Sequence, residues 1–330
     1  MIGHASVVRW GLIAFLLLGC HWNWRGAAVA AAETTTIRST SISGRKYVLL
    51  RDVASYYNLT YKKLSNGVEL SSKYSKILLY DNKRGAVING VPVTLNFVPL
   101  LTRGNRYLSY NDFINTLDPI MRKAALTGHK VRTIVIDPGH GGKAAGAVGK
   151  FSQEKNNALV IAKKLKAKLE KLGYKVLLTR STDVDLALTA RPALAKKWKA
   201  DLFISLHNNS STDLSVRGIE TFSLTPLGAP GSYNKNIEKE WVAGDKYTRN
   251  NQALAFYIQK GLISRTGAEN RGVKRARFVV LRDASCPAVL IEMGFISNVS
   301  DEKNLNSRVY QEKLLQGIVD GIVNYRNRVE

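Results

Sequence analysis

The stretch RTIVIDPGHGGKAAGAVGKFSQEKNN, Arg132 to Asn157, joins an apolar strand, a histidine, a glycine-rich loop and the polar start of a helix. Its strand, Thr133 to Asp137, is a mostly continuous apolar run, which is typical of a strand in a parallel sheet that helices cover on both faces. His140 follows the strand, and Glu154 opens the next helix. In an open α/β sheet, ligands bind at the carboxyl ends of the strands. The stretch therefore predicts an α/β fold, and it places His140 and Glu154 where a ligand-binding site is expected.

Strand-like and helix-like segments alternate from there to the end of the chain. The helical repeat from Ala158 to Leu172 predicts a helix that Ser152 caps and Gly173 ends. Further helices are expected around 191–199, 251–266 and 309–326. The predicted strands are 133–137, 174–180, 201–207, 219–224, 278–281 and 288–295. We therefore expect an α/β fold with a largely parallel six-stranded sheet that helices cover on both faces.

The segment 36–121 shows a different pattern, in which short β-like runs alternate with turn signals such as Asn66-Gly67 and Asn89-Gly90. Asn-Gly favours tight hairpins because both residues tolerate positive φ. One short helix is expected around 51–57. The pattern predicts a small β-rich α+β module, followed by a linker at 122–131 and the main domain at 132–330. The module contains no histidine or cysteine, so we expect a binding or spacing role there and no catalytic metal.

The first 32 residues predict a secretory signal peptide. They contain no acidic residue and combine Arg9, an apolar run from Trp10 to Cys20 and a small-residue stretch at 28–32. The run is shorter than the roughly 20 residues of a spanning helix, so no transmembrane anchor is expected. Lipoprotein processing at Cys20 is the alternative. We expect export to the periplasm, the cell envelope or the medium.

The chain carries a net charge of +24, which becomes +22 (24 − 2) without Arg9 and Arg25 of the leader. Such a charge attracts polyanions. For an exported protein the expected polyanions are anionic polymers of the cell wall. Nucleic acid is not expected, because no stacking or groove-reading motif is present. Without the leader, Cys286 is the only cysteine, which excludes an intramolecular disulfide and leaves nitrogen and oxygen atoms as metal ligands.

Two of the three histidines outside the leader end predicted strands. His140 follows the first strand and His207 ends the third, whereas His129 lies in the linker. A single histidine at a strand end is usually a hydrogen-bonded structural residue, but two on one edge of a sheet favour metal binding. Together with Glu154 they supply two imidazoles and one carboxylate, which leaves the fourth tetrahedral position for water, as in catalytic zinc sites. We predict one Zn²⁺ per catalytic domain.

Hydrolysis also requires a group that moves a proton from water to the leaving amine. Glu292 is the candidate, because it lies in the apolar strand LIEMGF, where an unpaired carboxylate is costly. The alternative is a structural salt bridge to a buried arginine, Arg180 or Arg191. Four other residues near predicted strand ends are either contacts for substrate carboxylates or solvated surface: Arg217, Glu220, Asn270 and Arg271.

Six motifs resemble, in order and spacing, the type 3 family of zinc-dependent N-acetylmuramoyl-L-alanine amidases: IVIDPGHGG, E154, SLHNN, RGIETF, NRGVK and PAVLIEMGFISN. The resemblance covers about 132–326. It implies hydrolysis of the amide between the lactyl group of muramic acid and L-alanine in peptidoglycan. It also implies that His140, Glu154 and His207 bind zinc and that Glu292 is the catalytic glutamate. Two asparagines after His207 depart from the family's usual residues without removing a ligand.

Two further segments allow interpretations by resemblance. Thr225 to Arg249 is longer than a connection from strand to helix needs, and in some relatives an inserted helix at this place blocks the zinc site. We weigh a lid here against an inert surface loop. The N-terminal module resembles more faintly the copper amine oxidase N-terminal-like domain, through YVLLRDVASYYNLTY, INGVPVTL and RYLSYNDF. That resemblance implies no copper and fits a wall-binding or spacer unit.

Two other functions stay open at this level. A zinc peptidase that cuts within the stem peptide would use the same metal chemistry. A non-catalytic wall-binding protein could retain the fold, although such proteins generally lose a ligand or the base, and this chain keeps all four residues. A protein activator would be a further partner besides peptidoglycan.

Overall fold

The computed structural model describes residues 37–233 and 236–330. The predicted signal peptide and Cys20 lie outside the described residues. Among the helices of the described part, none combines the length and the apolar character that crossing a membrane requires.

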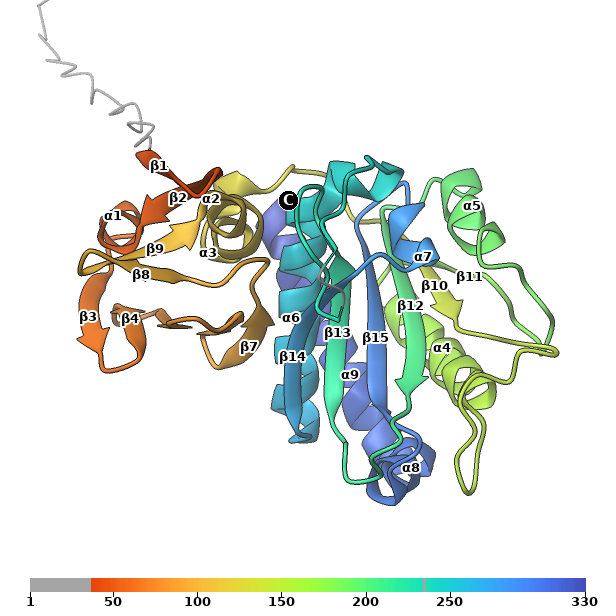
Figure 1. Ribbon diagram of the computed structural model, residues 1–330. Helices are drawn as coiled ribbons and strands as arrows, with labels where there is room; N and C mark the ends of the chain where they lie inside the picture. Colours follow the sequence, from red (N-terminus) through yellow and green to blue (C-terminus); the bar gives the residue numbers. More distant parts are fainter. Residues whose placement is uncertain (1–36, 234–235) are drawn as a thin grey trace, which may run out of the picture. The chain divides into compact units, whose positions relative to one another are not determined.

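The main part of the chain forms six neighbouring strands in the order β11-β10-β12-β15-β13-β14 (Figure 1). Four of them, β10, β11, β12 and β15, are parallel, whereas β13 runs antiparallel to β15 and β14 runs parallel to β13. Their bounds are β10 Thr133–Pro138, β11 Lys175–Leu178, β12 Leu202–Asn209, β13 Ile219–Leu224, β14 Asn270–Ala276 and β15 Ala288–Phe295. The prediction of a largely parallel sheet in an α/β fold is confirmed.

One of the six predicted strands is wrong. The run 278–281, FVVL, enters the short helix α7 (Val279–Arg282), and the sixth strand is β14, which is built from NRGVKRA. A four-residue apolar run does not distinguish a strand from a buried helix. The hydrophobic pattern does not indicate β14, because this strand contains charged residues. They can be buried because they have partners: Arg275 donates to the carbonyl oxygens of Leu224 and Asn115.

Helices cover both faces of this sheet (Figure 1). α4 (Glu154–Lys171), α6 (Thr248–Thr266) and α9 (Arg308–Val329) pack in the larger apolar cluster, and α5 (Ala190–Lys197) and α7 pack in a smaller one on the other face. α6 and α9 approach closely at Gly317, where a Cβ would lie 2.7 Å from Leu262 Cα. α8 (Val299–Asn306) was not predicted.

The start of α4 differs from the prediction by one residue. Gln153, and not Ser152, is the N-cap. The Ser152 hydroxyl instead donates to Glu302 of α8 and accepts from Asn157. Gly173 follows the last helical turn with φ +86°, as the sequence predicts for a helix end.

The N-terminal part is β-rich, as predicted. One antiparallel sheet has the order β1-β2-β9-β8, and a run of hairpins joins β3 to β7. The strands are β1 Ser39–Ile42, β2 Arg45–Leu49, β3 Thr60–Leu64, β4 Gly67–Ser71, β5 Lys76–Tyr80, β6 Gly85–Ile88, β7 Val91–Thr94, β8 Leu100–Thr102 and β9 Asn105–Ser109. The helices are α1 Leu50–Tyr56, α2 Tyr110–Asp112 and α3 Asp118–Met121. Asn89 and Gly90 both have positive φ between β6 and β7, as a tight hairpin requires.

The six-stranded sheet does not end at β14, because β7 pairs with β14 in parallel, and the strands β7 to β3 extend it to eleven. Residues 37–330 accordingly form one compact unit. The segment expected to be a linker lies against helices: the Thr127 amide donates to Asn250 of α6, and the His129 amide donates to the Val329 carbonyl of α9. Because β7 and β14 lie far apart in the sequence, no local pattern predicts their pairing.

Candidate metal centre

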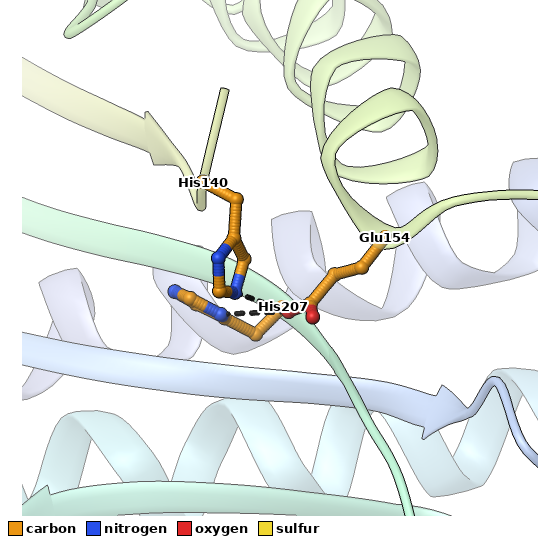
Figure 2. A group of neighbouring side chains, drawn as sticks. All are labelled: His140, Glu154 and His207. Carbon is orange, nitrogen blue, oxygen red and sulfur yellow. Dashed lines mark hydrogen bonds and ion pairs between the residues drawn. The ribbon is translucent and has the colours of Figure 1, made fainter. Parts of the chain in front are cut away.

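His140, Glu154 and His207 meet at one edge of the sheet (Figure 2). Each offers one ligand atom, and these atoms all lie within 4.8 Å of one another. Glu154 Oε1 is 3.2 Å from His140 Nε2 and 2.8 Å from His207 Nδ1. The structure thus brings together the three side chains that the sequence singled out as metal ligands.

The topology explains this meeting. β10 and β12 are parallel neighbours, so His140, just after β10, and His207, near the end of β12, reach the same edge. The glycine-rich loop then leads the chain back to Glu154, the first residue of α4. Gly146 in this loop has φ +71°, and a Cβ there would lie 2.4 Å from Glu154 Oε2 and 2.7 Å from His140 Cδ2. Only glycine leaves room for both side chains at this point.

His140 itself adopts a left-handed conformation, with φ +58°. This conformation costs a non-glycine residue roughly 1–2 kcal/mol and is often found at functional sites. Two buried arginines hold the turn through its carbonyl oxygens: Arg191 Nη2 donates to His140 O at 2.8 Å, and Arg180 Nη2 donates to Gly139 O at 2.8 Å. Hydrogen bonds to charged groups thus stabilise the strained turn that presents the imidazole.

Asp137 stabilises the turn at His140 through buried hydrogen bonds. It is fully buried, and its carboxylate accepts from Thr179, Arg191 and Ser205. The same Arg191 guanidinium binds the His140 carbonyl, so Asp137 acts on His140 through Arg191.

Glu154 is only 4% exposed, and both of its oxygens have partners. Oε1 accepts from the Asn208 amide at 3.0 Å and Oε2 from the Ala147 amide at 2.7 Å. Burial by itself would raise the pKa of Glu154, but hydrogen bonds with His140 and His207 outweigh burial and hold the pKa well below its usual range. An ionised carboxylate beside two imidazole nitrogens is a donor set that fits a divalent cation such as zinc.

Glu292 lies beside this cluster on β15, directly opposite His207 in the strand register. Its Oε2 is buried and has no hydrogen-bond partner among the described residues. Burial, followed by the charges of Glu154 and Glu220, raises the pKa of Glu292 well above its usual range. The salt-bridge alternative is wrong, because Arg180 and Arg191 bind the carbonyl oxygens of the His140 turn and Asp137 instead.

Glu220 is a second acid beside Glu292, which it faces across β13 and β15. It is fully buried, so it is not solvated surface; it accepts from Asn209 Nδ2 at 2.8 Å and from Arg271 Nε at 3.3 Å. The signal that singled out Glu292, an ionisable residue within an apolar strand, applies equally to Glu220 in IETFSL. The other two of the four residues lie elsewhere: Arg217 is exposed and pairs with Glu269, and Asn270 accepts from Gln259.

A third acid, Glu302 of α8, was missed by sequence reasoning. It is buried, and its carboxylate accepts from the backbone amides of Lys150, Phe151 and Ser152 at 2.6–2.9 Å. These amides belong to the loop that delivers Glu154 to the site. Glu302 lies 148 residues (302 − 154) after Glu154 in the chain, so no local pattern connects the two.

The profile of the N-acetylmuramoyl-L-alanine amidase family matches residues 134–324, which is more than half of the chain. This chain belongs to that family. The amidase LytC of Bacillus subtilis is 33% identical over 294 residues, which cover 87% of this chain and 55% of LytC. The amidase AmiA of Escherichia coli is 33% identical over 228 residues, which cover 62% of this chain and 78% of AmiA. The chain thus spans about half the length of LytC.

Solved structures agree with the family. The catalytic domain of CwlV, an N-acetylmuramoyl-L-alanine amidase from Paenibacillus polymyxa, matches with a TM-score of 0.51 and 33% identity. The match covers 60% of this chain and 99% of the CwlV domain. The family and the fold that the motifs predict are therefore confirmed.

In this amidase fold, the segment Thr225 to Arg249 connects β13 to α6, and its last two residues already belong to α6. Residues 234 and 235 are not described. Arg277 holds the segment through Asp245 at 2.6 Å and Glu238 at 3.5 Å, and Arg84 of the N-terminal part donates to the carbonyl oxygens of Pro230 and Gly231. The lid stays a prediction.

Among the described residues of this segment, Tyr233 contacts Glu220, one of the acids beside the candidate metal centre. Its hydroxyl lies 3.3 and 3.4 Å from the two carboxylate oxygens of Glu220, although 70% of the residue is exposed.

Proposed function

We propose that this chain is a zinc-dependent N-acetylmuramoyl-L-alanine amidase, which hydrolyses the amide between the lactyl group of muramic acid and L-alanine in peptidoglycan. Family membership supports the reaction. The observation that carries the proposal is the meeting of three metal-ligating side chains within 4.8 Å, next to a buried carboxylate with an unpartnered oxygen.

His140, Glu154 and His207 would hold one Zn²⁺ per catalytic domain. A bound zinc ion polarises the amide carbonyl and lowers the pKa of a water molecule. The Ala147 and Asn208 amides fix the Glu154 carboxylate, and Arg191 fixes the turn of His140, so these donors are positioned before the ion binds. Such support from surrounding groups tightens metal binding and orients the ligands.

Glu292 would act as general base and then as general acid. Its Oε2 accepts a proton from the attacking water, and the same proton then passes to the nitrogen of the departing L-alanine. The position opposite His207 supports this role, because it places the carboxylate beside the metal ligands without making it one of them. Burial and the charges of the neighbouring acids raise the pKa of Glu292, which suits a carboxylate that first accepts and then releases the same proton.

Digestion of purified peptidoglycan tests the reaction. The expected products are free stem peptides with an intact amino-terminal L-alanine and glycan strands without peptides, as identified by mass spectrometry. Shortened peptides that remain on the sugar would instead indicate the zinc peptidase. Binding to the wall without any product would indicate the non-catalytic protein.

We further propose the domain roles that the sequence predicts. Residues 1–32 direct export. Residues 36–121 form a wall-binding or spacing module. Residues 122–131 link this module to the catalytic domain, which comprises residues 132–330. The net charge of +22 without the leader supports binding to anionic wall polymers. Amino-terminal sequencing of the exported protein tests the signal peptide, and release of the protein from isolated walls by rising salt tests the electrostatic attachment.

A further inference from the structure

A row of side chains crosses one face of the sheet, starting at the candidate metal centre. Side chains alternate between faces along a strand. Phe203, Leu290, Phe222 and Ala276 all pack in the smaller apolar cluster, so their faces are known. His207, Glu292, Glu220 and Lys274 lie at even spacing from these four residues. They therefore point to that same face.

The strand register orders this row. His207 is opposite Glu292, Glu292 is opposite Glu220, and Lys274 is opposite Phe222, the second residue after Glu220. The row thus contains His207 of the candidate metal centre, the two acids and, three strands from β12, Lys274. The ammonium group at its far end would attract a bound carboxylate.

Lys274 differs from its charged neighbours on β14. Arg271 pairs with Glu220, and Arg275 donates to the Leu224 and Asn115 carbonyl oxygens. The Lys274 side chain is half-buried, and it makes no hydrogen bond or ion pair with any residue in 37–233 or 236–330. Burial, only partly offset by the charge of Glu220, lowers the pKa of Lys274. A partly desolvated cation without a partner is costly, so its presence beside a site favours a role in binding an anion.

Aromatic rings pack around Phe222, the residue paired with Lys274 in the strand register. Phe222, opposite Lys274, lies 5.1 Å from Phe278 and 6.1 Å from Tyr233 between ring centroids. A salt bridge to a half-buried lysine is less screened than one on open surface.

We propose that Lys274 binds a carboxylate of the stem peptide beyond the L-alanine. The inference rests on the proposed amidase function. Neighbouring strands lie about 4.8 Å apart, so β14 is about 14 Å from β12. An extended peptide covers about 3.3–3.6 Å per residue, so the carboxylate belongs to a residue about two to four positions after the scissile bond. Lys274 then decides which stem peptides bind well, whereas the metal centre and Glu292 decide the reaction.

Steady-state kinetics of the full, zinc-loaded chain test this proposal. Two soluble muropeptides serve as probes: one has free carboxylates in its stem peptide, and in the other the same carboxylates are amidated. The Lys274→Met variant should raise KM for the free-carboxylate substrate by about 10-fold or more, because a charged hydrogen bond is lost. Its kcat should stay within about twofold, and its KM for the amidated substrate should hardly change. Lys274→Arg should restore most of the affinity.

The controls separate this subsite from the reaction itself. Lys197→Met removes an exposed lysine of α5 and should change neither KM. Lys274→Gln, with its melting temperature measured, replaces Lys274→Met if the latter fails to fold. Equal KM changes for both substrates, or none, would overturn the proposal. A wild-type chain that cleaves neither muropeptide but folds and binds zinc would contradict the proposed function instead.

Discussion

Glu292 of β15 lies directly between His207 of β12 and Glu220 of β13 in the strand register. Paired residues of neighbouring strands point to the same face of a sheet, so the three side chains form one line. A buried carboxylate with an oxygen that has no hydrogen-bond partner among the described residues is thereby placed next to an imidazole of the candidate metal centre.

Replacing Glu292 by glutamine should separate catalysis from metal binding. The amide keeps the size of the side chain but cannot accept a proton from water, and general acid–base catalysis contributes about 10²–10⁴-fold. We expect kcat to fall by at least about 10²-fold while elemental analysis still finds one zinc per chain. Activity at the wild-type level would refute the assigned role of Glu292.

Replacing His207 by alanine should abolish tight metal binding. Zinc added to the metal-free wild-type protein should raise its melting temperature, since a ligand at 100 times its Kd stabilises the folded state by about 2.7 kcal/mol. This gain should vanish in His207→Ala. His129→Ala is the matched control, because His129 lies outside the cluster and should leave the zinc-dependent shift intact. An unchanged shift in His207→Ala would show that the ion binds elsewhere.

Gly146→Ala should damage the metal centre through sterics alone. The new Cβ would lie 2.4 Å from Glu154 Oε2, and the positive φ adds backbone strain. Gly173→Ala provides a control, because Gly173 also has a positive φ but has open space around its Cβ position. Backbone strain should cost both variants about 1–2 kcal/mol of stability. Gly146→Ala should lose more because of the clash, and only Gly146→Ala should lose zinc affinity, as measured by competition with a chelator. Equal zinc affinities of the two variants would contradict this account.

Cys286 should be unreactive in the folded protein. It is 3% exposed, and burial, with a smaller contribution from Asp201, raises its pKa to about 12. In a Cys20→Ser background, a thiol-alkylating reagent at pH 8 should label the unfolded chain and not the native one. Rapid labelling of the native protein would show that the thiol is accessible.

The same thiol makes stability depend on pH in the alkaline range. The unfolded state loses its thiol proton above about pH 8.5, whereas the folded state retains it up to its raised pKa, so stability falls as pH rises through this window. The contribution is about 1.4 kcal/mol per pH unit. Urea unfolding between pH 8 and 10 should show this extra decline relative to Cys286→Ala. Identical pH dependences of the two proteins would exclude it.

Much of this protein was predictable from local sequence. Continuous apolar runs indicate five of the six strands of the main sheet, and helical spacing indicates α4, α5, α6 and α9. His140, Glu154 and His207 were predictable as a cluster, because parallel strands bring their carboxyl ends to one edge. Glu292 could be singled out as a candidate catalytic residue, because an unpaired ionisable side chain within an apolar strand is costly.

Other features were decided by tertiary structure alone. β14 is a strand because Glu220 and the carbonyl oxygens of Leu224 and Asn115 satisfy its arginines, and its pairing with β7 extends the sheet. Glu302, 148 residues (302 − 154) after Glu154, accepts hydrogen bonds from the loop before Glu154. Lys274 comes to the same face of the sheet as Glu220 and Glu292 only through strand register. The physical reason is common to all of them. Periodicity reports which face of an element is buried, whereas register and partner choice depend on contacts between segments that lie far apart in the chain.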